Sequence, residues 1–171
     1  MNRIWLFRAS ALLALAVPVP ASSAVSPLMV GVGAHGYDWL VGAWTCKNDV
    51  PSTMAGPAVT TLTVARSANG SLSIRSDGAG FDAVGFVAYA AKSKTWWNPT
   101  ALADGDSSNE SSRQTGKKTL WTGSFFDAER GKTIPIRDTY TVSGEMSFGD
   151  LSEAQVGGAW KTQANTTCTK S

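Results

Sequence analysis

Two cysteines, Cys46 and Cys168, stand near opposite ends of the chain, and the sequence contains no others. Neither has the CxxC spacing or the neighbouring histidine that marks a catalytic thiol. In an oxidising compartment such a pair forms a disulfide, which would close a loop of roughly 120 residues. We therefore expect the first and last structured segments of the chain to lie side by side.

The N-terminal residues indicate that the chain is exported. Arg3 and Arg8 precede a short apolar segment, Ala9–Val17, which Pro18 ends before it is long enough to span a bilayer. Small residues follow, in the layout of a secretory signal peptide that is cleaved after Ala24. We expect a signal peptide over residues 1–24, a flexible N-terminal arm over 25–36, a single domain over 37–171 and a periplasmic or secreted location.

The charge of the mature chain excludes nucleic acid as a partner. Removal of residues 1–24 takes away Arg3 and Arg8 and leaves equal numbers of basic and acidic residues, which form no basic cluster. A nucleic-acid groove needs a concentrated positive face. No later apolar segment is long enough for a transmembrane helix, so we also expect no membrane span.

Turn signals recur roughly every 8–12 residues, which is typical of an all-β chain. The strongest is Asn69-Gly70, for which we expect a type I′ hairpin turn. We expect strands near residues 41–48, 58–66, 71–76, 84–91, 94–98, 106–114, 118–126, 133–142, 145–149 and 159–169. Helical turns are expected only over 36–40 and 151–155. This pattern, with the two ends joined, predicts an antiparallel up-and-down barrel of eight to ten strands, with an open sandwich as the alternative.

The alternation of side chains along strands places further residues relative to the cysteines. If Cys46 stands opposite Cys168, then Trp44 stands opposite Lys170, whose ammonium group could cover the indole ring. On the last strand we expect one face to hold Trp160, Thr162, Ala164, Thr166 and Cys168.

The phrase Gly42-Ala43-Trp44, which follows a short turn segment, resembles the G-x-W signature of the first strand in lipocalins and the wider calycin barrels. In those families the tryptophan packs at the closed end of the barrel and a late basic residue covers it. The resemblance implies that Gly42, Trp44 and Lys170 close the barrel of this chain.

The chain is also similar to an uncharacterised family of exported bacterial barrels. The likeness rests on an aromatic-D-x-x-x-G-x-W-x-C phrase at Tyr37–Cys46, a G-K-x-x-P-x-R phrase at Gly131–Arg137 and a W-x(7)-C-x-K phrase at Trp160–Lys170, together with the middle phrase Tyr89–Trp97. It extends over nearly all of the mature chain. It supports the fold and implies no chemistry.

The sequence has too few histidines and no motif for a catalytic or cofactor-binding site, so we expect neither catalysis nor a cofactor. Haem-binding nitrobindin-like barrels use a histidine on a late strand, whereas the one histidine here, His35, precedes the first expected strand. The biotin-binding phrases of avidin-like barrels have no counterpart. A metal site needs three or four ligands and a serine hydrolase needs a positioned histidine, so we expect neither a metal nor an enzyme.

Candidate ligand contacts come from the expected strand Ile134–Val142, whose apolar face carries Asp138 and Tyr140. A buried carboxylate needs a cation or several donors, so Asp138 is either part of a structural ion pair or a polar anchor in a cavity. The rings of Trp121, Tyr89 and Trp97 could line the same cavity, with ordinary core packing as the alternative.

Segment Asp106–Gln114 is polar on both faces, which a sealed apolar barrel could not accept as a full strand. It is therefore either an edge or loop, or a strand beside a wet interior. The leading functional hypothesis is a non-catalytic exported barrel that binds a small apolar or amphipathic molecule. The alternative is a protein-binding module, such as a periplasmic protease inhibitor that inserts the arm over 25–36 or an envelope accessory protein without a pocket.

Overall fold

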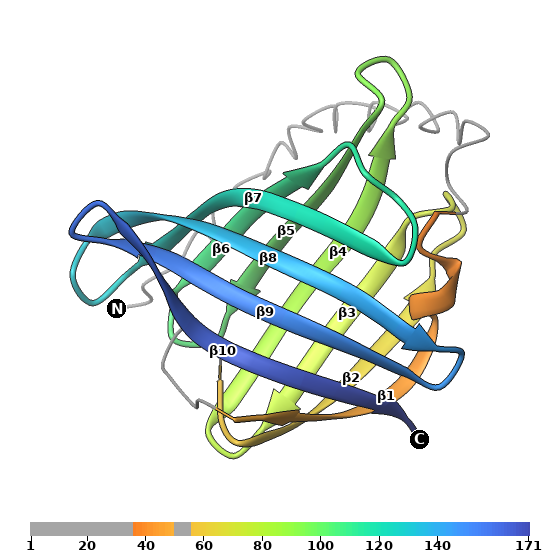
Figure 1. Ribbon diagram of the computed structural model, residues 1–171, viewed down its shortest axis with the longest axis horizontal. Coiled ribbons are helices and arrows are strands. Elements are labelled where there is room, and N and C mark those ends of the chain that lie inside the picture. Colours follow the sequence, from red (N-terminus) through yellow and green to blue (C-terminus); the bar gives the residue numbers. More distant parts are fainter. Residues whose placement is uncertain (1–35, 50–55) are drawn as a thin grey trace, which may run out of the picture.

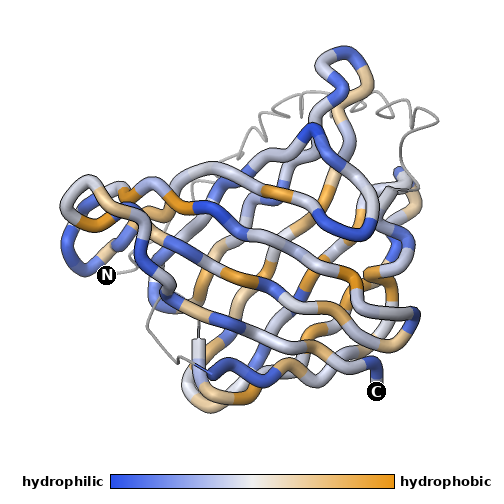
Figure 2. The backbone as a smooth tube through the Cα atoms, viewed as in Figure 1, coloured by the Kyte–Doolittle hydropathy of each residue, from blue (hydrophilic) through white to orange (hydrophobic). Residues whose placement is uncertain are grey.

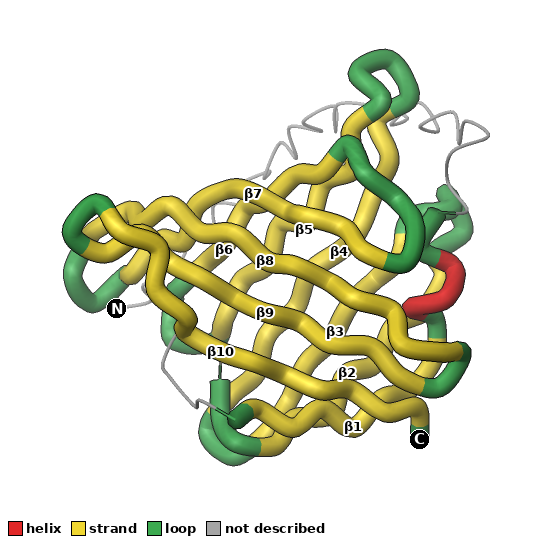
Figure 3. The backbone as a smooth tube through the Cα atoms, viewed as in Figure 1, coloured by secondary structure: helices red, strands yellow, loops and turns green. Residues whose placement is uncertain are grey.

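The computed structural model describes residues 36–49 and 56–171, and most of these residues lie in β-strands (Figure 3). One 3-10 turn, η1 (Asp38–Leu40), precedes the first strand. The ten strands of the described residues are β1 (Gly42–Asn48), β2 (Val59–Arg66), β3 (Leu72–Gly78), β4 (Phe81–Ala90), β5 (Thr95–Leu102), β6 (Ser107–Ser112), β7 (Lys118–Asp127), β8 (Lys132–Gly144), β9 (Ser147–Val156) and β10 (Ala159–Lys170). Each overlaps a segment for which the sequence predicts a strand, so the all-β prediction is confirmed. The helical turn predicted over 151–155 is wrong, because these residues lie within β9.

The strands form a closed antiparallel barrel in which each strand pairs with its neighbours in sequence and β10 returns to pair with β1. Figure 1 shows β7–β10 crossing in front of β2–β5, with the C-terminal strand next to β1. Cys46 lies opposite Cys168 and Trp44 opposite Lys170, and the two cysteine sulfurs are bonded. The disulfide and the up-and-down barrel are therefore confirmed, and the open sandwich is excluded.

The disulfide fits an extracellular or periplasmic location, where thiols are oxidised. None of the helical segments in the described part of the chain is long and apolar enough to cross a bilayer. The predicted signal peptide over 1–24 and all but the last residue of the predicted arm over 25–36 lie outside the described residues, so both stay predictions.

One end of the barrel is filled by side chains around Trp44. Its buried indole donates a hydrogen bond from Nε1 to the Leu40 carbonyl oxygen at 2.8 Å and packs edge-on against Phe148. Lys170 Nζ lies 5.1 Å from the indole centroid, so the ammonium group covers the ring. A Cβ at Gly42 would lie 2.7 Å from Lys170 Cε. The structure thus brings Gly42, Trp44 and Lys170 together at this end, and the φ of 136° at Gly42 favours glycine there.

A bulge in β10 changes one predicted face. The pairing between β9 and β10 shifts between Thr162 and Ala164, and one extra residue reverses the faces of the residues beyond it. Trp160 is therefore on the outer surface, where the guanidinium of Arg137 lies 4.4 Å from its ring. The prediction that Trp160 and Thr162 share a face with Cys168 is wrong.

The hairpin at Asn69-Gly70 occurs where the sequence predicts it but has another geometry. Gly70 has a φ of 82°, whereas Asn69 keeps a negative φ, so the type I′ assignment is wrong. The Gly70 N–H donates to the Ser67 carbonyl oxygen, and the Asn69 side-chain oxygen accepts from Ser71. The asparagine side chain holds the turn in place of a second left-handed residue.

Hydrophobic and hydrophilic residues alternate along much of the barrel (Figure 2), as expected for strands with one face buried. β6 departs from this pattern, because Ser108, Glu110 and Ser112 occupy its inward positions. The polar segment is therefore a full strand of the closed barrel. Its inner face makes part of the barrel interior polar.

Candidate functional site: a cavity with three carboxyl groups

The barrel encloses a cavity of about 210 Å³ between the packed end and the opposite end. One part of its wall comes from β2 and β3, where the apolar Leu62 and Ile74 lie beside Thr60 and Ser76. The other part is polar and comes from β5, β6, β8 and β9: Asn98, Thr100, Ser108, Glu110, Asp138, Tyr140, Asp150 and Ser152. Strands β3 and β8 lie on opposite sides of the closed barrel, so Leu62 and Ile74 face the more polar side that carries the acids.

The polar side chains line the cavity together because residues two apart on a strand share a face, and this face is the inner one. Asp138 and Tyr140 occupy alternate positions on β8, and Asp150 on β9 pairs with Tyr140. Glu110 belongs to β6, which is separated from β8 by β7. Three carboxyl groups from three different strands therefore face the same space.

Gly123 on β7 is the residue that lets Glu110 approach β8. Glu110 pairs with Gly123, and Gly123 pairs in turn with Ile136. A Cβ on Gly123 would collide with the Asn109 carbonyl oxygen and lie 2.7 Å from the Glu110 Cα. Gly123 therefore permits a close approach of the β6 backbone, and it leaves the inner face of β7 without a side chain between two carboxyl groups.

Burial governs the protonation of the three acids. It raises the pKa of Glu110 well above the ordinary value, and Asp138 and Asp150 raise it further. Burial also raises the pKa of Asp150 well above its usual range, with repulsion from Asp138 as the second cause. The pKa of Asp138 is raised by burial, while hydrogen bonds from Ser152 and Glu110 lower it. Burial thus favours the protonated form of all three acids, most strongly that of Glu110 and Asp150.

The wall of the cavity supplies acceptors that have no hydrogen-bond donor. They are Oδ1 of Asn98, Oε1 of Glu110 and Oδ1 of Asp150. Asn98 is 6% exposed and Glu110 is 3% exposed, so neither can turn to bulk water. A buried acceptor without a partner is costly, which makes these atoms the natural contacts for a ligand or for bound water.

A second hollow of about 120 Å³ adjoins the cavity and shares Phe81, Ala83 and Asp138 with it. It extends to Leu102 at the end of β5 and to Gln163 in the β10 bulge. This direction leads away from the packed end and toward the connections β5–β6 and β7–β8.

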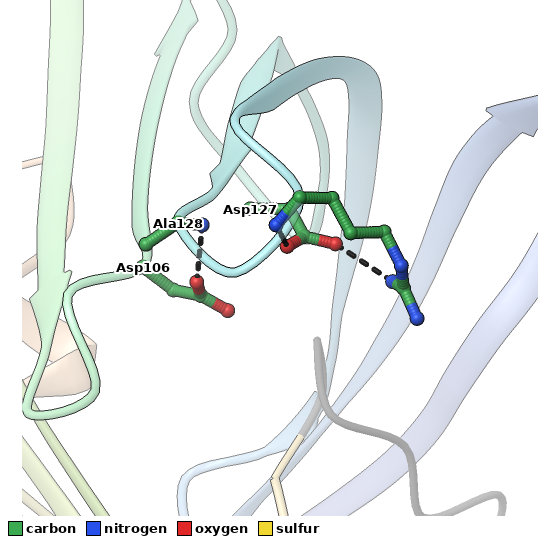
Figure 4. Close-up of polar contacts among 4 residues, drawn as sticks. Asp106, Asp127 and Ala128 are labelled. Carbon is green, nitrogen blue, oxygen red and sulfur yellow. Dashed lines mark hydrogen bonds and ion pairs between the residues drawn. The ribbon is translucent and has the colours of Figure 1, made fainter.

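Side-chain contacts hold these two connections together at the rim (Figure 4). Asp106 Oδ1 accepts a hydrogen bond from the Ala128 N–H at 2.8 Å. Asp127 accepts one from the Arg130 N–H at 2.8 Å and forms an ion pair with its guanidinium at 2.7 Å. The rim of the barrel near the second hollow is therefore ordered by its own side chains.

The structure divides the five ligand contacts predicted from the sequence. Asp138 and Tyr140 line the cavity. Trp121 and Tyr89 face the interior but belong to the packed end, where Trp121 is 0% exposed and Tyr89 lies against Trp96. Trp97 is on the outer surface and 42% exposed, so its assignment to the cavity is wrong.

Two acids in the cavity were not predicted from the sequence. Glu110 lies in the polar segment 106–114, and the alternation Ser108, Glu110, Ser112 is the signal that could have identified it. Asp150 falls just beyond the end of the expected strand 145–149 and before the expected helical turn, so its inward direction could not be assigned. No arginine, lysine or histidine lines either hollow among the described residues.

Comparison of the sequence with protein-family models and with curated proteins gives no match. The closed antiparallel barrel is consistent with the calycin-like architecture that the G-x-W phrase suggests. Inferences about function therefore depend on the cavity itself.

The raised pKa values of Glu110 and Asp150 predict an unusual dependence of stability on pH. In the unfolded chain these acids ionise near pH 4, whereas the folded chain keeps them protonated to higher pH. The folded state then binds more protons, so the free energy of unfolding contributed by these groups falls as pH rises above about 4. Urea unfolding between pH 4 and 8 should show this fall, and Glu110→Gln with Asp150→Asn should flatten it.

Two ion-paired acids act in the opposite direction at lower pH. A backbone hydrogen bond from Arg130 lowers the pKa of Asp127, and the Arg137 side chain lowers that of Glu153. The stabilisation that these ion-paired acids give is lost as pH falls below about 4. Above that pH, the change in the free energy of unfolding comes from the buried acids. The exposed substitution Glu145→Gln serves as the control. An unchanged slope in the double variant would contradict the prediction.

Proposed function

We propose that this chain is an exported, non-catalytic binding protein that holds a small amphipathic molecule inside its barrel. The observation that supports this proposal is a cavity inside the barrel that carries apolar side chains on one side and unpartnered acceptors on the other. A purely apolar ligand would leave those acceptors without donors. The polar wall therefore favours an amphipathic ligand over an apolar one.

The proposal includes no chemical step. Burial raises the pKa of Glu110 and of Asp150, which favours their protonated form, and hydrogen bonds from Ser152 and Glu110 lower the pKa of Asp138. Such acids suit an anchoring role. We further propose that the chain carries a signal peptide cleaved after Ala24 and belongs with the exported bacterial barrels it resembles.

A cavity-filling substitution tests the binding proposal. Ala83 lines both hollows and is buried, so the Ala83→Phe variant should exclude the ligand without removing a polar contact. Native mass spectrometry of protein purified after export should show a bound small molecule in the wild type and at least a tenfold lower occupancy in the variant.

The matched control for this experiment is Ala101→Phe, which adds the same ring at an exposed position of the adjacent β5. It should retain the ligand of the wild type. Equal occupancy in both variants, or a wild-type barrel that is empty after export and binds no amphipathic probe, would refute the proposal.

The alternative, a protein-binding module such as a periplasmic protease inhibitor or envelope accessory protein, stays a prediction. The arm that would insert into a protease spans residues 25–36, and residues 25–35 lie outside the described part of the chain. The cavity favours a small ligand instead.

A further inference from the structure

The polar side of the cavity carries three acceptor atoms without a donor, although the hydroxyl groups of Thr100, Ser108 and Ser152 line the same cavity. Asn98 Oδ1, Glu110 Oε1 and Asp150 Oδ1 have no hydrogen-bond partner, and Asn98 and Glu110 are more than nine-tenths buried. A molecule that satisfied all three would have to donate several hydrogen bonds from one end. Among common polar groups, an ammonium group donates three and accepts none.

The charges around the cavity point to the same chemistry. Three carboxyl groups face it, and its lining among the described residues contains no basic side chain. An anionic ligand would disfavour ionisation of these carboxyl groups, whereas a cation would supply the positive charge that stabilises their ionised form. In a buried site an ion pair with such a cation would be weakly screened.

We propose that the ligand is an organic ammonium ion, a small amine with an apolar body, held with its nitrogen among Asn98, Glu110 and Asp150. This inference rests on the binding function proposed above. The apolar body would lie against Leu62 and Ile74 on the other side of the barrel. The hydroxyl of Tyr140, which also faces this space, would be a further acceptor for the ammonium group.

A metal ion fits the same acids less well. Within residues 36–49 and 56–171 no group of three or more potential ligands is arranged to hold a metal. An ammonium group accepts a looser arrangement, since each of its hydrogen bonds is made separately. The three acceptors come from β5, β6 and β9, which suits a group that reaches several strands.

Binding of an ammonium ion should release protons. Burial raises the pKa of Glu110 and of Asp150, which favours their protonated form in the empty barrel. A cation placed beside them favours the ionised form, so a proton leaves for the solvent as the amine enters. The charged groups that face this space are Glu110, Asp138 and Asp150, with the hydroxyl of Tyr140 beside them.

Three ligands of nearly equal shape test the inference: hexylammonium, 1-hexanol and hexanoate. Isothermal titration calorimetry of the wild-type protein at pH 7 should show hexylammonium binding at least tenfold more tightly than hexanol, and no binding of hexanoate. Titrations in phosphate and in HEPES, which differ in ionisation enthalpy, should show that protons are released with the amine. Hexanol binding as tightly as hexylammonium would overturn the inference.

The variant Glu110→Gln with Asp150→Asn should bring the hexylammonium-to-hexanol affinity ratio to within twofold of one. Asp138→Asn gives a second variant if the first does not fold, and it should lower the ratio in the same direction. Glu145→Gln, an exposed change, should leave it unaltered. An unchanged ratio in a folded cavity variant would overturn the inference.

The outcomes separate the two proposals. If hexanol binds and the amine has no advantage, the ammonium inference fails and the proposed binding function stands. If none of the three binds and the exported protein carries no ligand, both fail. The wild-type comparison needs no variant, so it can overturn the inference even if neither cavity variant folds.

Discussion

Replacement of both cysteines, Cys46→Ala with Cys168→Ala, should lower the free energy of unfolding by about 5 kcal/mol. The disulfide joins residues that are 122 apart in sequence, so without it the unfolded chain gains the conformational freedom of almost the whole domain. Small domains are stable by only about 5–15 kcal/mol in total. Urea unfolding of the oxidised wild type and the double variant, at one pH, measures the difference.

The control for this experiment lies next to the disulfide. Thr45 and Thr169 pair on the same two strands, one residue from the cysteines and on the outer face. Replacing both with alanine should cost no more than about 1 kcal/mol, as is usual for surface positions. A cysteine variant within that range of the wild type would contradict the prediction and show that the barrel closes through β1–β10 pairing alone.

The closure of the barrel could be predicted because two independent signals agree. The cysteine pair joins the first and last strands, and the recurring turns leave no segment long enough for a different connection. Once Cys46 faces Cys168, strand alternation places Trp44 opposite Lys170 without further information. The alternation of side chains predicts cross-strand pairs correctly when a disulfide fixes the register of the two strands.

The same rules fail where a bulge shifts the register, and where either of two adjacent aromatic residues could face the interior. Trp160 lies beyond the β10 bulge, and a bulge adds a residue without a clear mark in the sequence. Of the adjacent pair Trp96 and Trp97, either could face inward, and the choice depends on the pairing of β5 with β4 and β6. The sequence predicts that one ring is inside but does not determine which.

The acid cluster could be predicted only in part for a related reason. Asp138 stands on a strand whose alternate positions are apolar, so its inward direction is visible in the sequence. Glu110 and Asp150 reach the same cavity from β6 and β9, and only the order of strands in the closed barrel brings them together. Contacts between side chains on two strands that flank a third depend on how much space the side chains of the middle strand leave.

Gly123→Ala should therefore have the other large effect, on stability and on the site together. The added methyl group would collide with the Asn109 carbonyl oxygen, and the Glu110 Cα is too close for the side chain to escape. Overpacking of a core usually costs about 1–3 kcal/mol. Here the obstacle is backbone, so β6 must move away from β7, and we expect a loss of about 3 kcal/mol or more in urea unfolding.

Gly149→Ala is the matched control, because the nearest atom to its Cβ would be the Thr166 carbonyl oxygen at 3.8 Å, an ordinary contact. Its effect should stay below about 1 kcal/mol. Since Glu110 pairs with Gly123, the displacement of β6 should also move its carboxyl group from Asp138 and weaken the fall in stability above pH 4. A Gly123→Ala protein as stable as Gly149→Ala, with the wild-type pH profile, would show that the space over β7 is not what brings the acids together.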